Sequence, residues 1–467
     1  MKLSRRRFLE IGTAATGGLL LNSVFTPART LASEEDPQLL LFCYFQGGYD
    51  QLLCFDPRPN DAPQFQIEAA SKAGGTSIAP VYQLIQEKRV TDVLLTNPSG
   101  VQQAGNLTFG PAVPKELLQH APDLALIRGI LMGTLTHDVG KRYFITGKFP
   151  RGVTANGSAM STVVAAAEGS QQLIPNLAIS HETYNEGFPS FASGINVNSA
   201  DDVLNLIRPI GKLLSPSSDT ALMEYELNID NCERRGYNAD GMVDLFMASR
   251  AKARTMTDPE GYGEYFKFAL PPPPQLEDIF NLFRINSLTA MKDARGKTAM
   301  AALALSLGIA QSVSVEIARD LDDHGDWAEN QGTTLYDGLE RLGNLITYLK
   351  NTEYKKTGKS TWSHTTLVAF SEFARTPLPN GRNGRDHHQS SSCMVAGPKI
   401  KGNTVIGGTD DNNMTARLAS FDTGLPADNG NIVRPTDIHA TLLHAMGLDY
   451  GHLANLSPQV ISALLKG

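Results

Sequence analysis

Residues 39–45 read LLLFCYF and are followed directly by QGGYD at residues 46–50. A continuous apolar run that ends in a glycine-rich turn is typical of a strand buried on both faces of a parallel sheet. Short apolar runs of the same kind occur at 124–127 (LALI), 177–180 (LAIS) and 366–370 (TLVAF). These runs predict further strands of one sheet.

Strand patterns alternate with helical patterns along the rest of the chain. Residues 312–317 (SVSVEI) and 393–396 add two expected strands. Between residues 335 and 349, leucine and isoleucine recur every three or four positions, which predicts a helix. Residues 435–446 predict a C-terminal helix, with a proline in its first turn and a glycine just after it. The alternation predicts an α/β fold, with a mostly parallel central sheet and helices on both faces.

One segment departs from this pattern. Residues 201–307 lack strand-like runs, carry a helical apolar face at 203–207 and contain four consecutive prolines at 271–274. We therefore expect a helical insertion that packs as a cap beside the sheet, near the strand ends.

Composition excludes several classes of protein. The 467 residues include 41 Lys and Arg against 48 Asp and Glu, a formal charge of −7, and 41% of residues are hydrophobic. Such a chain can bury a large core and is neither disordered nor basic enough to suggest a nucleic-acid binder. Four scattered cysteines are too few for a disulfide scaffold or a zinc ribbon.

The first 32 residues have the features of an export signal. Residues 4–9 read SRRRFL, an apolar stretch occupies 11–25, and small residues precede the acidic run at 33–36. The arginine pair matches the twin-arginine motif, so we expect cleavage near Ser33, a mature domain at 38–467 and a periplasmic or secreted product. The alternatives are an amphipathic first helix or an uncleaved anchor. No later segment is apolar enough to span a bilayer.

Polar side chains follow several of the predicted strands. In open parallel sheets, ligands bind beyond the carboxyl ends of the strands, so these side chains are expected to converge. Carboxylates and imidazoles without cysteine suit Zn²⁺, Mn²⁺, Fe or a pair of hard cations, whereas arginines suit tetrahedral oxyanions. The candidate metal ligands and catalytic groups are Asp50, His137, Asp322, His324, Glu372, Arg375, Arg385 and His387.

Each candidate also has a purely structural interpretation. Asp50 could be a turn residue or a helix N-cap, and His137 alone could be structural. Arg375 could pair with Glu372 only to hold a loop. In an extended segment Asp322 and His324 would point to the same side while Asp323 points away, which favours the first two as joint ligands.

Four motifs give the chain a resemblance to a known family. FQGGYD at 45–50, DDH at 322–324, SEFARTP at 371–377 and GRDH at 384–387 resemble the signatures of the domain-of-unknown-function 1501 family. The resemblance extends over the mature chain and implies an alkaline-phosphatase-like α/β sandwich allied to the sulfatases. It also implies divalent cations (Zn, Mn, Ca or Mg) held at Asp50, Asp322, His324, Glu372 and His387. Glu372 departs from the Asp-His pair usual in that superfamily.

The nucleophile departs further from the superfamily pattern. Sulfatases carry C/S-x-P-x-R, but the nearest string here, CFDPR at 54–58, has its proline one place late, so we reject it. The candidate hydroxyls Thr134, Thr136, Thr154 and Ser158 are not distinguished by spacing. Two hypotheses remain open. The first is an exported metal-dependent hydrolase of sulfate or phosphate esters acting on a small-molecule or glycan ester. The second is a non-catalytic exported scaffold that keeps the fold and binds a glycan or a partner at the envelope.

Overall fold

The protein is described from a computed structural model. It describes residues 37–58, 101–169, 172–207, 261–325, 327–355, 357–377, 380–382, 384–411 and 413–467. The predicted export signal and the middle of the predicted helical insertion, 208–260, lie outside these residues.

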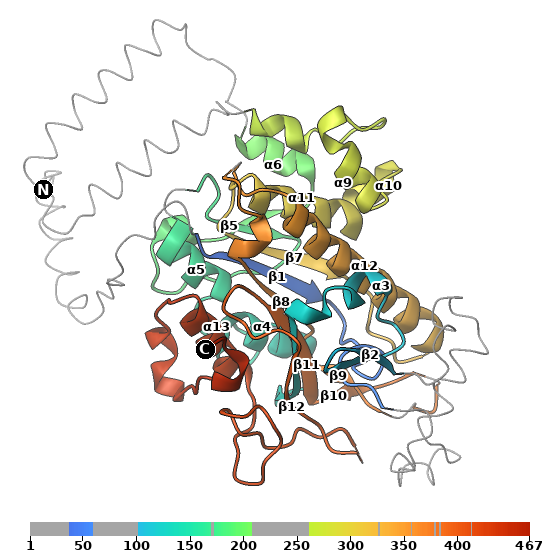
Figure 1. Cartoon of the computed structure of the whole chain (residues 1–467), viewed down its shortest axis with the longest axis vertical. Helices are drawn as coiled ribbons and strands as arrows, with labels where there is room; N and C mark the ends of the chain where they lie inside the picture. Colours follow the sequence, from blue (N-terminus) through green and yellow to red (C-terminus); the bar gives the residue numbers. More distant parts are fainter. Residues whose placement is uncertain are drawn as a thin grey trace, which may run out of the picture.

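Eight strands of the described chain form one central sheet, in the order β12-β4-β11-β8-β1-β7-β5-β6 (Figure 1). Two pairs of short strands, β2 with β3 and β9 with β10, lie outside it. The strands are β1 (Leu39–Phe45), β2 (Gln102–Ala104), β3 (Leu107–Phe109), β4 (Leu124–Leu131), β5 (Asn176–Ile179), β6 (Ile195–Val197), β7 (Ser312–Ala318), β8 (Thr365–Phe370), β9 (Ala374–Arg375), β10 (His387–His388), β11 (Ser390–Ala396) and β12 (Thr404–Gly407).

The sheet is mostly parallel. β1 pairs in parallel with β7 and β8, and β5 pairs in parallel with β6 and β7. β11 runs antiparallel to both of its neighbours, β4 and β8, so it alone is reversed within this sheet. The carboxyl ends of β1, β5, β7 and β8 therefore meet at one edge, as parallel strands must.

Helices cover both faces of the sheet. They are α3 (Lys115–Leu118), α4 (His137–Thr146), α5 (Met160–Glu168), α6 (Ala200–Ile207), α9 (Glu277–Leu282), α10 (Leu288–Lys292), α11 (Ala294–Ser306), α12 (Trp327–Asn351) and α13 (Pro435–Ala445). One apolar core joins the sheet to α11 and α12, and a second joins it to α4, α5 and α13 (Figure 1).

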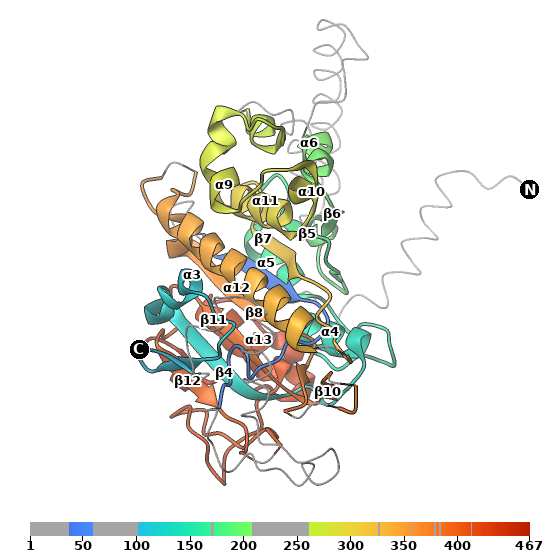
Figure 2. The same cartoon turned by 90° about the vertical axis from the view of Figure 1, so that its right-hand side faces the viewer.

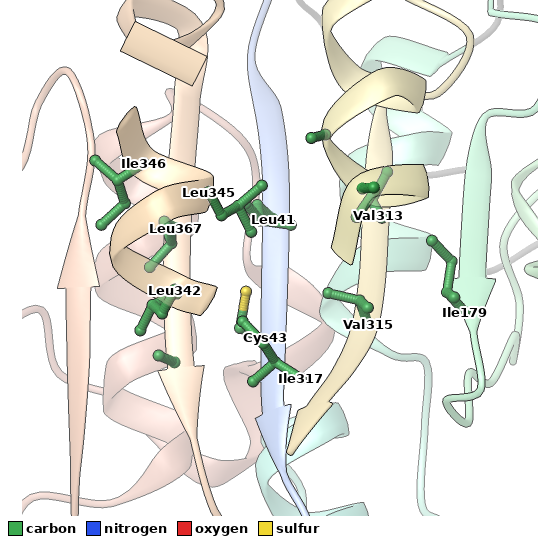
Figure 3. Close-up of a cluster of buried hydrophobic side chains, with 14 of the residues drawn as sticks. Leu41, Cys43, Ile179, Val313, Val315, Ile317, Leu342, Leu345, Ile346 and Leu367 are labelled. Carbon is green, nitrogen blue, oxygen red and sulfur yellow. The ribbon is translucent and has the colours of Figure 1, made fainter. Parts of the chain in front are cut away.

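The first predicted strand explains why both faces must be covered. All seven side chains of β1 are buried, and they alternate between the two cores. Leu41 and Cys43 face α12, where Leu342 and Leu345 lie over them (Figure 3). Burying a side chain of this size stabilises the fold by about 1.5–3 kcal/mol, so a run without polar residues fits the centre of the sheet.

The described parts of the expected insertion are helical. α6, α9 and α10 gather at one end of the molecule, beyond the β6 edge of the sheet, in both views (Figures 1 and 2). α11 continues from this group and packs on β7. Within the described ranges, none of the helices combines the length and apolar character needed to cross a bilayer.

The predicted α/β class, with its mostly parallel sheet, is confirmed. The strands at the two edges, β6 and β12, were not predicted, because each is only three or four residues long and partly exposed. All seven residues of β7, predicted as a strand at 312–317, are buried, because helices cover both of its faces.

Candidate metal centre

The glycine-rich turn after β1 allows two loops to approach closely. Gly47 has a φ of +113°, and a Cβ atom there would lie 2.5 Å from the backbone nitrogen of Asp322. Only glycine tolerates both conditions. The turn therefore brings the loop after β7, which carries Asp322, against the end of β1.

Arg375 fixes this arrangement from β9. It is fully buried, and its guanidinium donates to the carbonyl oxygens of Gly47, Gly48 and Arg385. Its Nη2 also donates to Asp322 Oδ1 at 2.7 Å. A planar fork with five N–H groups can satisfy all these acceptors at once. Arg375 thus ties Asp322 to the turn after β1.

His137 enters from the first turn of α4, directly after β4. Its Nδ1 lies 2.6 Å from Glu372 Oε1, and its Nε2 lies 3.2 Å from Asp322 Oδ2. α4 can approach because it has Gly140 at the contact, where a Cβ would lie 2.3 Å from the carbonyl oxygen of Glu372. Glu372 is fully buried and also accepts hydrogen bonds from Gly47 N–H and the Ser371 hydroxyl.

Two further imidazoles point their Nε2 atoms at the same carboxylate. His324 Nε2 and His387 Nε2 each lie 3.1 Å from Asp322 Oδ1, and they lie 3.0 Å from each other. One donor atom each from His137, Asp322 and His387 can be chosen so that all lie within 4.8 Å of one another. We call the four side chains His137, Asp322, His324 and His387 the His–Asp cluster.

Every imidazole of the cluster has an oxygen acceptor at its other nitrogen. His137 Nδ1 meets Glu372 Oε1 at 2.6 Å, His324 Nδ1 meets Asp386 Oδ1 at 2.7 Å, and His387 Nδ1 meets the carbonyl of Leu135 at 2.6 Å. An ionised carboxylate or a carbonyl can only accept, so each Nδ1 carries the proton. In the neutral tautomer, each Nε2 then presents a lone pair to the cluster.

The charges of the cluster also depend on its neighbours. Partial burial opposes ionisation of Asp322, but the hydrogen bond and the charge of Arg375 hold its pKa well below the ordinary value. Burial lowers the pKa of His387. The hydrogen bond and charge of Glu372 outweigh burial and raise the pKa of His137. Asp322 is therefore an anion at neutral pH, and His387 is a neutral imidazole.

This donor set fits a divalent cation. The Nε2 atoms of His324 and His387 lie 3.0 Å apart, and each ring has an acceptor at its Nδ1, so a proton or a cation has to lie between the two Nε2 atoms. Nitrogen ligands of a tetrahedral zinc ion, each about 2.0–2.1 Å from the metal, lie roughly 3.3 Å apart. Imidazoles that bind metals usually donate their second N–H to a carboxylate or a backbone carbonyl, as all three do here.

The structure separates the eight predicted site residues into two groups. Asp322, His324 and His387 meet in the cluster, and His137, which was predicted as a catalytic group, joins them. Glu372 lies behind His137 at its Nδ1 rather than beside the Nε2 atoms.

The remaining predicted residues have buried protein partners. Asp50 is fully buried, and its Oδ2 lies 2.8 Å from Arg385 Nη1 in an ion pair of which neither side chain is exposed. Arg375 is also fully buried and holds Asp322 and backbone carbonyls. We therefore revise the predicted role of both arginines from binding substrate oxygens to positioning protein groups.

The candidate nucleophiles differ in their burial and in their distance along the chain from the cluster residues. Thr134 and Thr136 flank Leu135, whose carbonyl accepts the hydrogen bond from His387. Ser158 is buried, and its hydroxyl exchanges hydrogen bonds with the backbone of Glu186. Cys54 is fully buried, and burial raises the pKa of its thiol, so it is neither ionised nor accessible. This is consistent with rejecting CFDPR as a sulfatase motif.

The outer partners of the imidazoles were not predicted as such. Asp386 lies in the GRDH motif at 384–387, but its pairing with His324 depends on how β10 folds back on β9. Nothing in the sequence indicates that the Leu135 carbonyl accepts a hydrogen bond from His387. For His137 as a member of the cluster, the one signal in the sequence was its position at the start of a helix that follows an apolar run.

Comparisons with known proteins agree with the family resemblance. A family model described as "Protein of unknown function (DUF1501)" matches residues 38–457. The comparison with curated proteins found no match.

Solved structures are similar over most of the chain at low sequence identity. Ps i-CgsB is 9% identical, with a TM-score of 0.36 over 91% of this chain and 75% of that chain. BT4656, solved with its substrate D-glucosamine-2-N,6-O-disulfate, is 9% identical, with a TM-score of 0.35 over 92% and 80%. The putative sulfatase yidJ from Bacteroides fragilis is 11% identical, with a TM-score of 0.34 over 94% and 80%.

Proposed function

The chain belongs to the DUF1501 family, and from that premise we propose that it is an exported metal-dependent hydrolase of sulfate or phosphate esters. One observation carries the proposal. Three imidazoles with acceptor-fixed Nδ1 atoms direct their Nε2 atoms toward one carboxylate. Packing alone gives no reason to gather three imidazoles around an ionised aspartate.

The residues of the cluster would hold one or two divalent cations. His324, His387 and Asp322 offer one set of donor atoms, and His137 adds a further nitrogen next to Asp322 Oδ2. Imidazole-rich sets favour zinc and other transition metals over calcium or magnesium, which prefer oxygen ligands. When bound, such a cation supplies Lewis acidity that polarises the oxygen atoms of an ester.

The surrounding residues hold the donors in place. Glu372, Asp386 and the Leu135 carbonyl fix the tautomer and orientation of the three rings. Arg375 fixes the Asp322 carboxylate and keeps it ionised. The cluster is not sealed from solvent, because the Asp322 side chain is 44% exposed. A substrate can therefore reach it.

Metal analysis of protein purified through its natural export route tests the proposal. We expect at least about one equivalent of a divalent transition metal, and His387→Ala should lose metal and any esterase activity together. His388→Ala is the matched control, because His388 is adjacent but its Nδ1 accepts from Ser390 N–H instead of facing the cluster. Full metal content in the His387→Ala protein would contradict the proposal.

The burial of two candidate nucleophiles supports a second function. Cys54 is buried, and the Ser158 hydroxyl is already bonded to Glu186, so neither offers a ready attacking group. This favours a scaffold that binds metal and a glycan or a partner without hydrolysing esters. The second function predicts a metal-loaded protein that is inactive on panels of aryl sulfates and aryl phosphates, whereas the first predicts turnover abolished by chelator.

A further inference from the structure

A cleft of about 760 Å³ lies beside the sheet. It is lined by residues at or just beyond the carboxyl ends of β1, β5, β6 and β7 and by residues of α4, α6, α10 and α11. This volume is within the range of small-molecule sites in proteins. The helices belong to the group at the end of the molecule in Figure 2.

The lining of this cleft is polar throughout. Asn196, Asn198 and Gln46 contribute side-chain amides, Ser180 and Ser199 contribute hydroxyls, and Tyr44 is the one phenol or indole ring among the described lining residues. None of those lining residues is aliphatic. Amides and hydroxyls that can both donate and accept suit a ligand with many hydroxyl groups.

Cations outnumber anions on the lining by one. Lys141, Lys292, Lys297 and Arg319 face Glu182, Asp201 and Glu316. The carboxylates are largely neutralised: Glu182 pairs with Lys141, and Glu316 pairs with Arg319 at 2.8 Å. A cation that is not fully neutralised is therefore available to an incoming anion.

Lys297 is that cation. Its side chain is only 12% exposed, yet within the described part of the chain its one ion pair is to Glu316 at 4.0 Å, too long for a hydrogen bond. Burial lowers its pKa. Lys292 is exposed at the rim of the same cleft. An anionic group bound between them would supply the missing acceptor.

The cleft is joined to the His–Asp cluster by three short connections. Lys141 follows His137 by one turn of α4, so both lie on the same helical face. Tyr44 lines the cleft, and the charge of Glu372, the carboxylate behind His137, adds to burial in raising the pKa of its phenol. Gln46 lines the cleft and precedes Gly47, whose N–H donates to Glu372.

We propose that this cleft binds a sugar that carries an anionic group of its own, with Lys297 and Lys292 holding the anion and the amides holding hydroxyls. The inference rests on the proposed function, since it makes the cleft the subsite for the part of the substrate that is not cleaved. The substrate then has two anionic groups, the ester at the cluster and a second group that stays intact in the cleft.

Titration calorimetry on chelator-treated mature protein tests the subsite separately from the metal. The probes are glucose 6-phosphate, glucose 6-sulfate and glucuronate, with glucose and inorganic phosphate as the comparison ligands. At least one anionic sugar should bind about tenfold more tightly than either comparison ligand, because a charge-assisted hydrogen bond and the hydroxyl contacts both contribute. Lys297→Met should weaken that binding about tenfold, whereas Lys401→Met, an exposed lysine outside the cleft, should not.

Two further variants distinguish failure of the subsite from misfolding of Lys297→Met and from failure of the proposed function. Lys292→Gln, at an exposed position that cannot disturb the core, should weaken binding about threefold even if Lys297→Met folds poorly. His387→Ala should lose metal but still bind the anionic sugar, so failure of the proposed function leaves this test intact. Absence of binding by every anionic sugar, or equal binding of inorganic phosphate, would overturn the inference.

Discussion

At the scale of single residues, the second nitrogen of each imidazole decides what the cluster can do. A histidine ring has two possible neutral tautomers, and an acceptor at Nδ1 selects the one with a free lone pair at Nε2. Glu372, Asp386 and the Leu135 carbonyl make the same selection for three different rings. The three rings thus direct their Nε2 atoms to one place, which is the arrangement a cation site requires.

Glu372→Gln should weaken metal binding about tenfold to a hundredfold. The amide keeps the size of the side chain, but it is a poorer acceptor for His137 Nδ1 and for the two other hydrogen bonds that Glu372 receives. Competition with a chromogenic chelator measures the affinity. Asn380→Ala removes the hydrogen bond to Asp386 and those to the backbone of His324, Arg382 and Gly384, but it removes no contact to an imidazole ring, so it should have a smaller effect. Unchanged affinity in Glu372→Gln would contradict the orienting role.

The buried ion pair of Asp50 and Arg385 makes a second prediction at this scale. Arg385→Met should cost about 3–5 kcal/mol in the free energy of unfolding, because it leaves the fully buried Asp50 carboxylate without its ion pair. Denaturant unfolding measures the loss. The double variant Asp50→Asn with Arg385→Met should recover part of it, and a double variant no more stable than Arg385→Met would argue against pairing as the cause.

At the scale of elements, the order of strands places the cluster. β1 lies between β7 and β8, so the loops after all three strands meet at one point, with α4 arriving from β4. The sequence allowed this convergence to be predicted, because continuous apolar runs mark buried parallel strands. It did not allow a division between ligands and supporting residues. That division depends on β9 and β10, two-residue strands whose pairing has no periodic pattern.

The same limit explains why some of the predicted metal ligands lie in the cluster and others do not. Asp50 and Asp322 both follow buried strands and are equivalent in sequence terms. In three dimensions one is fully buried against an arginine and the other is 44% exposed among imidazoles. Burial depends on the turn geometry after each strand, which spacing does not encode. The cleft beside β5 and β6 could not be predicted either. Residues of the helical insertion line it, and the sequence does not show how that insertion packs on the sheet.

The packing of α13 against α4 predicts how stability depends on pH. His439 is fully buried, its Nε2 lies 2.7 Å from the carbonyl of Phe144, and burial lowers its pKa to about 4. The unfolded chain binds the proton below about pH 6.5 and the folded protein only below about pH 4. Stability should therefore fall by roughly 3 kcal/mol as the pH drops from 6.5 to 4.

Unfolding of wild type and His439→Gln across this pH range checks the prediction. Glutamine keeps a donor for the Phe144 carbonyl but does not titrate, so the variant should lose less stability on acidification. His181 is a second contributor, because burial also lowers its pKa to about 4. Parallel pH profiles for wild type and variant would show that His439 does not contribute.

At the scale of the whole molecule, the described residues form one α/β body with two neighbouring polar sites. The His–Asp cluster lies where β1, β7 and β8 end, and the cleft lies toward β5 and β6. Glu372 connects them, since it accepts from His137 and also from the N–H of Gly47, which follows the cleft residue Gln46. In a substrate that spans both sites, the cleft would hold the intact anion and the His–Asp cluster would hold the ester.

Export remains a prediction at this scale. Replacing Arg5 and Arg6 with lysine should abolish export, because the twin-arginine pathway reads the arginine pair rather than its charge. Fractionation followed by immunoblotting measures the distribution, and N-terminal sequencing should place the mature start near Ser33. Export of the double variant at the wild-type level would exclude this pathway, and Met1 on the exported protein would exclude cleavage.

X-ray absorption spectroscopy of the zinc-loaded protein tests the central claim, that the Nε2 atoms of the cluster and Asp322 form a cation site. The account predicts a first shell of nitrogen and oxygen at about 2.0–2.1 Å, with the outer-shell scattering of at least two imidazole rings. His387→Ala should remove about one ring from that signal, whereas His388→Ala should leave it unchanged. A first shell of oxygen alone, without imidazole scattering, would contradict the account.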